Sequence, residues 1–155
     1  GEIIHLQGTP GASASRDRGK GFSDEIAKHS GIKVVAKQTA NFDRSKALDV
    51  TTNLVQAHPK VTGIFAENDE MAIGAISALG SKAGKSVKVV GFDGTADGIK
   101  AVKAGTLGAT IAQQPGLLGK TAVDQAAEIL DGKEVSKTTP IKVLLVTKDN
   151  AKDYE

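Results

Sequence analysis

The apolar residues of this chain fall into two kinds of pattern that alternate along its length. Short apolar runs predict strands at 2–7, 32–38, 61–66, 87–92, 108–113 and 141–147. Apolar residues recurring three and four positions apart predict helices at 12–29, 43–57, 69–81, 95–104 and 116–131. Strands and helices of these lengths are typical of right-handed crossovers in a parallel sheet. We therefore expect an α/β fold, a mostly parallel open sheet flanked by helices, as in flavodoxin-like and Rossmann-like proteins.

Local signals support several of the expected helix boundaries. Asp43, Asp69 and Thr95 stand where a side-chain oxygen can cap the helix that follows. Pro59 ends the helix predicted over 43–57, because proline cannot continue a helix and disfavours helical geometry in the residue before it.

The segment 114–140 differs from the rest of the chain. Its predicted helix carries a wide apolar stripe, formed by Leu118, Ala122, Val123, Ala126, Ile129 and Leu130. A stripe of this width needs a surface to pack against, and the preceding strand–helix units already form a closed layer. We therefore expect this helix to pack on something that the chain lacks. The first strand also begins almost directly after Gly1, which suggests a piece trimmed from a longer protein.

Composition excludes several classes of function. A net charge of +2 and an aromatic content of 3% do not favour binding to nucleic acid or to a membrane surface. The chain has no cysteine, so disulfides, thiolate metal sites and cysteine nucleophiles are excluded. No run approaches the roughly 18 apolar residues of a membrane span, and the first residues do not resemble a signal peptide.

Polar and aromatic residues follow the predicted strands at the point where each strand ends. They are Arg16, Phe42, Asn68, Asp93 and Gln113. Ligands of open parallel sheets bind outside the carboxyl ends of the strands, and a helical arginine leans toward the start of its helix, so Arg16 can reach this edge. Amides, a carboxylate and a guanidinium suit vicinal hydroxyls, and a phenyl ring suits the face of a sugar. The set describes a polyol site better than an anion site.

Each of these residues also has a simpler interpretation when it is taken alone. Asn68 and Asp93 are common as cap or turn residues. Phe42 fits a hydrophobic core, and Arg16 fits a solvated surface. Their shared placement at successive strand ends favours the site.

Motifs for enzymatic chemistry are weak. The loop "GTPGAS" at 8–13 matches neither G-x-G-x-x-G nor G-x-x-x-x-G-K-[ST]. His5, His29 and His58 lack a metal-ligand spacing and are expected to be structural. The acidic pair in "NDE" at 68–70 suggests a metal, but negative charge at a helix start is stabilising in itself, so a cap is preferred. We expect a binding protein without cofactor or metal, not an enzyme.

Five stretches resemble one protein family in order along the whole chain. They are "GTPGASASRDRGKGF", "ANFDRSKAL", "IFAENDEMAIGAI", "VVGFDGT" and "ATIAQQP". The family is the type I periplasmic sugar-binding proteins of bacterial ABC transporters, and within it the resemblance is to the ribose receptors. Its members fold into two similar α/β lobes joined by three crossover strands, with the sugar between the lobes.

The resemblance implies a domain division and a set of contacts. Residues 1–113 correspond to the C-terminal sugar-binding lobe, 114–140 to a crossover and helix belonging to the N-terminal lobe, and 141–155 to a return strand and tail. The N-terminal lobe and the first helix of the C-terminal lobe have no counterpart in this chain. The family's ligand positions in this lobe match Arg16, Phe42, Asn68, Asp93 and Gln113.

The resemblance also implies partners and a location. The ligand would be D-ribose or a related monosaccharide, and the receptor would deliver it to an ABC permease or signal to a chemoreceptor. Such a protein is exported and is periplasmic or lipid-anchored outside the membrane. A lone lobe would bind sugar very weakly or not at all, and its 116–131 helix would be mobile or exchanged between molecules in a swapped dimer. The alternatives are the effector-binding core of a LacI-type repressor and an isolated or engineered half-receptor without activity.

Overall fold

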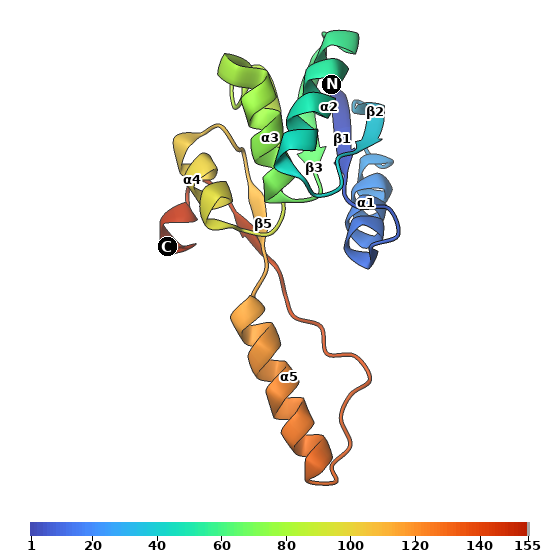
Figure 1. Cartoon of the computed structure of the whole chain (residues 1–155), viewed down its shortest axis with the longest axis vertical. Helices are drawn as coiled ribbons and strands as arrows, with labels where there is room; N and C mark the ends of the chain where they lie inside the picture. The colour runs from blue at the N-terminus through green and yellow to red at the C-terminus, as the bar shows by residue number, and fades with distance from the viewer. Residues whose placement is uncertain (155) are drawn as a thin grey trace.

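The computed structural model describes residues 1–154 and has a mostly parallel sheet at its centre (Figure 1). Four parallel strands lie in the order β2, β1, β3, β4, with the bounds Lys33–Thr39, Glu2–Gln7, Val61–Ala66 and Lys88–Val90. Strand β5 (Thr110–Ala112) runs beside the end of β4 through parallel bridges, and β6 (Leu144–Val146) pairs with β5 in the antiparallel sense. The expected fold class is confirmed.

Helices lie on both faces of this sheet. The four that do so are α1 Ser13–Ile26, α2 Arg44–Ala57, α3 Asp69–Leu79 and α4 Ala96–Ala104. The fifth helix, α5 Pro115–Leu130, lies apart from the sheet (Figure 1), and short 3-10 turns span Gly80–Lys82 and Ala151–Tyr154. The connection from β1 to β2 leads toward one edge of the sheet, whereas the later connections lead toward the other edge. Right-handed crossovers therefore place α1 on one face and α2, α3 and α4 on the other.

The hydrophobic core is concentrated on the face covered by α2, α3 and α4. Met71, Ala72 and Ala75 of α3 are fully buried, as are Ile4 and Leu6 of the central strand β1. Helix α1 is different, because it contains no buried residue. The two faces of the sheet are thus covered to very different extents.

The helix caps agree with the sequence at two of three positions. Asp43 accepts a hydrogen bond from the Lys46 amide at 2.7 Å, and Thr95 caps α4 in the same way. The expectation that Asp69 caps α3 is wrong, since Asn68 is the cap residue and accepts from the Met71 amide at 2.9 Å. Asp69 is already inside the first turn, where its side chain is fully buried.

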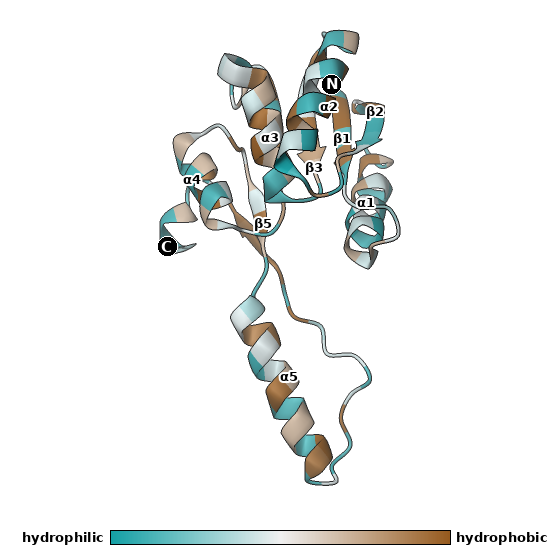
Figure 2. Cartoon of the chain, in the orientation of Figure 1, coloured by the Kyte–Doolittle hydropathy of each residue, from teal (hydrophilic) through white to brown (hydrophobic). Residues whose placement is uncertain are grey.

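Helix α5 and the segment that follows it extend away from the rest of the molecule (Figure 1). Apolar residues recur along its surface (Figure 2), and the large exposed ones are Leu117, Leu118, Val123, Ile129 and Leu130. Leu130 is 87% exposed. The boundaries expected at 113/114 and 140/141 stay a prediction, and the exposure of α5 agrees with them. Within residues 1–154, no helix has the length and apolar character needed to cross a membrane.

Candidate functional site

An arginine and an aspartate meet at the edge where the parallel strands end. The guanidinium Nη2 of Arg18 lies 3.0 Å from Oδ1 of Asp93. The Gln113 amide donates to the same oxygen at 2.8 Å, and Nη1 of Arg18 donates to the Glu67 carbonyl oxygen at 2.6 Å. The side chains of Arg18 and Asp93 are only 14% and 24% exposed. Helix α1 and the ends of β3, β4 and β5 thus supply one polar cluster.

Arg16, the arginine expected at this edge, is not part of the cluster. Its side chain is 66% exposed and pairs with the neighbouring Asp17 at 2.9 Å. Residues advance by about 100° around a helix, so positions 16 and 18 lie on nearly opposite sides of α1. Arg18 shares the sheet-facing side with Phe22, four residues on. Helical phase relative to Phe22 was the signal in the sequence that could have identified Arg18.

Two phenyl rings border the guanidinium of Arg18. Its central carbon lies 3.9 Å from the ring centroid of Phe92 and 5.9 Å from that of Phe42. The expected residue Phe42 is therefore at the edge, whereas Phe92 was not anticipated from the sequence. An arginine held over aromatic rings gains from the electrostatic attraction between a cation and a ring face.

Asn68 connects the α3 start to the loop that carries Phe42. Its Oδ1 is occupied by the helix cap, and its Nδ2 donates to the Phe42 carbonyl oxygen at 3.4 Å. The simpler interpretation of Asn68 as a cap is thus correct, and the same side chain also lies at the edge. The structure brings together four of the five expected residues, namely Phe42, Asn68, Asp93 and Gln113.

Strained backbone is concentrated at this edge. Among residues 1–154, the non-glycine residues with positive φ are Asn41 at 56°, Phe42 at 61° and Asp93 at 120°. This region is unfavourable for residues with a Cβ atom, and such strain persists only where the surrounding structure holds it. Its coincidence with Phe42 and Asp93 supports a functional role for the edge.

The carboxylates of the edge are electrostatically perturbed. Burial raises the pKa of Asp93 above its ordinary value, which Arg18 and Gln113 oppose and the nearby Asp69 carboxylate reinforces. Burial also raises the pKa of Asp69, against hydrogen bonds from Thr110 and Thr95. Among the described residues, no group of three acidic, histidine or cysteine side chains could hold a metal ion. The edge therefore offers directed donors, an acceptor and two apolar rings, a combination suited to a neutral polyhydroxylated ring.

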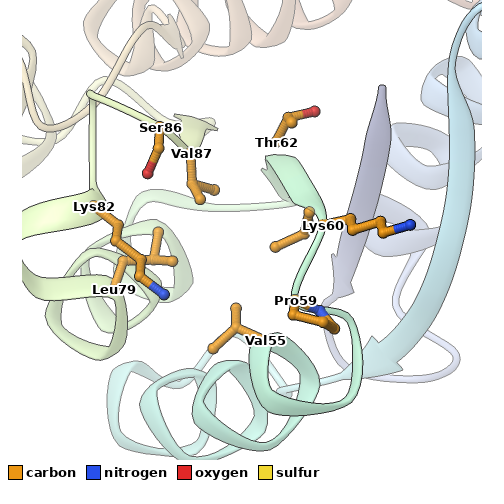
Figure 3. Close-up of a pocket in the computed structure, with 9 residues that line it drawn as sticks. Val55, Pro59, Lys60, Thr62, Leu79, Lys82, Ser86 and Val87 are labelled. Atoms are coloured by element: carbon orange, nitrogen blue, oxygen red, sulfur yellow. The ribbon is translucent and has the colours of Figure 1, made fainter.

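Other concave surfaces lie outside this cluster or overlap with it. A pocket of about 270 Å³ lies at the opposite, amino edge of the sheet, between Val55 of α2 and Leu79 of α3 (Figure 3). A more open groove of about 510 Å³ runs beside α1 over Phe65, Val90 and Ile111. The groove is mainly apolar, and its lining includes Arg18 and Phe92 of the cluster.

Comparison with known proteins supplies the family. Residues 1–134 match the family described as periplasmic binding protein domain. The chain is 50% identical over 147 residues to the ribose import binding protein of Salmonella typhimurium, covering 95% of this chain and 49% of that protein. It is 49% identical over 144 residues to the ribose import binding protein of Bacillus subtilis, covering 92% of this chain and 46% of that protein.

Comparison with solved structures points to the same kind of protein. A solved periplasmic solute-binding protein of an ABC transporter from Actinobacillus succinogenes, with bound D-allose, is 36% identical and superposes with a TM-score of 0.95. That match covers 99% of this chain and 55% of the solved one. The chain thus spans about half the length of the curated relatives it matches. With the family match over most of its length and close relatives among sugar-binding transport proteins, the chain belongs to the periplasmic binding protein family.

Proposed function

We propose that this chain supplies one sugar-binding lobe of a non-enzymatic receptor for D-ribose or a closely related monosaccharide. The observation that carries the proposal is the Arg18–Asp93–Gln113 cluster beside Phe42 and Phe92. Asp93 would accept from sugar hydroxyls, Arg18 and Gln113 would donate, and the rings would cover an apolar sugar face. Asn68 would lie at the rim of the same site.

The rest of the proposal follows from the family and the matched length. The segment 114–140 would belong to a second lobe, with 141–155 returning to this one. Sugar contacts to both lobes would favour a closed state through hinge motion. The receptor would act outside the cell membrane, in the periplasm or on a lipid anchor, and deliver sugar to an ABC permease.

The test is an NMR titration of the chain with D-ribose, following backbone amides. At high millimolar ribose, we expect shifts confined to the strand-end residues, with Leu118 of α5 as an internal reference. In Asp93→Ala, the apparent affinity for ribose obtained from these shifts should fall by about tenfold or more, because a charged hydrogen-bond acceptor is lost. Asp97→Ala, which removes an exposed carboxylate of α4, is the matched control.

Two results would contradict the proposal. One is ribose-dependent shifts that lie away from the strand ends, and the other is equal binding by the wild type and Asp93→Ala. Calorimetry gives a separate check of the two-lobe requirement. One lobe makes only part of the contacts, so micromolar affinity in the lone chain would show that the second lobe is dispensable.

A further inference from the structure

Packing alone does not explain how α1 is held against the sheet. No residue of α1 is buried, and its cap position, Ala12, has no side-chain acceptor. The open groove over Phe65 and Val90 runs along one side of the helix. The main apolar contact is Phe22, whose ring stacks on Phe65 with centroids 4.6 Å apart. The orientation of Arg18 on this helix therefore needs another constraint.

A buried carboxylate lies beneath the first two turns of α1. Glu67, which directly follows β3, is fully buried and accepts hydrogen bonds through both side-chain oxygens. Oε1 is 2.8 Å from Nε2 of His5, while Oε2 accepts from the Gly8 amide at 2.7 Å and from the Ser15 hydroxyl. Burial would raise the pKa of Glu67, but the hydrogen bonds from His5, Ser15 and Gly8 outweigh it and hold the pKa below its ordinary value.

Gly19 shows how closely the helix approaches this carboxylate. A Cβ atom at position 19 would lie 2.7 Å from Oε1 of Glu67. Ser15 and Gly19 are four residues apart and so share one side of the helix. The main-chain oxygen of Glu67 additionally accepts from Arg18 at 2.6 Å. The residue that directly follows β3 thus contacts α1 at Ser15, Arg18 and Gly19.

We propose that Glu67 is a positioning residue, which holds the start of α1 through Ser15 and Gly19 and thereby sets Arg18 against Asp93. We call this set of contacts the Glu67 anchor. The effect of the Glu67 anchor on sugar binding rests on the proposed function, but the anchor itself requires no ligand. It can therefore be tested in the absence of sugar, and its failure would leave the proposed binding function untouched.

The first test compares Ser15→Ala with Ser13→Ala, an exposed serine in the same turn. In Ser15→Ala we expect amide exchange in α1 to accelerate by about tenfold, because a hydrogen bond to a charged group is lost. We also expect the Arg18 side-chain Nε–H resonance to shift in Ser15→Ala and to stay unmoved in Ser13→Ala. An unchanged Arg18 resonance in Ser15→Ala would overturn the proposal.

The second test compares Gly19→Ala with Gly21→Ala. Both changes favour helix formation, but a Cβ at position 21 meets no atom within 4 Å. We expect Gly19→Ala to move the Arg18 resonance and speed exchange in α1, and Gly21→Ala to slow that exchange. If both variants slow exchange and leave Arg18 unmoved, Glu67 does not position the helix.

Discussion

At the scale of single residues, the position of Phe42 depends on the absence of a side chain at Gly8. A Cβ atom at position 8 would lie 2.1 Å from Cζ of the Phe42 ring. Phe42 also adopts a φ of 61°, which its own Cβ disfavours. The position of the Phe42 ring is therefore set by its contact with the end of β1, and not by the backbone preference of Phe42 itself.

Gly8→Ala should displace this ring and destabilise the fold. Overpacking of a close contact typically costs about 1–3 kcal/mol, and we expect a loss in that range in the free energy of unfolding measured with urea. Gly31→Ala is the control, because a Cβ there meets no atom within 4 Å. Equal unfolding free energies for the two variants would show that the Phe42 ring moves without cost.

The buried carboxylates make opposing contributions to stability as a function of pH. Glu67 has a lowered pKa in the folded state, so the stability it contributes is present above its unfolded pKa and is lost as pH falls through the folded pKa. Asp69 and Asp93 have raised pKa values, so their contribution is present below the unfolded pKa and is lost as pH rises through the folded pKa.

A comparison of the wild type with Glu67→Gln isolates the first of these effects. The difference between their free energies of unfolding should shrink as pH falls below the unfolded-state pKa of about 4.3, because the unfolded chain then binds more protons than the folded carboxylate with its lowered pKa. Denaturant melts at several pH values measure it. A difference that is constant with pH would mean that the ionised form of Glu67 contributes nothing.

At the scale of elements, the order and type of helices and strands followed from the hydrophobic pattern. Periodicity is a local property of the chain, so the strands β1 to β3 and the helices α1 to α5 appear close to their predicted ranges. The later strands are shorter than predicted, with three residues each in β4, β5 and β6. The side of a helix that faces the sheet depends on packing. The structure places Arg18, and not the expected Arg16, on that side of α1.

At the scale of the whole molecule, the conspicuous feature is an apolar helix without a partner. The five large apolar residues of α5 are between 43% and 87% exposed. Exposed apolar rows of this kind usually mark surfaces that are covered in a larger assembly. The proposed second lobe would cover α5, and in its absence we expect α5 to be mobile or paired with a second copy.

Hydrogen exchange at two protein concentrations distinguishes these states. In a demonstrated dilute monomer, we expect the amides of α5 to exchange far faster than those of α3, because α5 has no buried residue. If copies pair through α5, its protection should rise with concentration, in step with the dimer fraction seen by sedimentation. Exchange in a monomer as slow in α5 as in α3 would contradict both states.

The sequence by itself determined the α/β class, the order of elements and the place where the candidate ligand-binding side chains gather. Parallel strands end at one edge of a sheet, so the residues after each strand, including Phe42, Asn68, Asp93 and Gln113, converge whatever the details of packing. Only the tertiary structure decided which arginine joins them, how Glu67 lies beneath α1, and that Gly8 and Gly19 must lack side chains. The helical phase of Arg18 relative to Phe22 was available in the sequence, but the Glu67 and glycine contacts join segments distant in the chain, and no local periodicity encodes them.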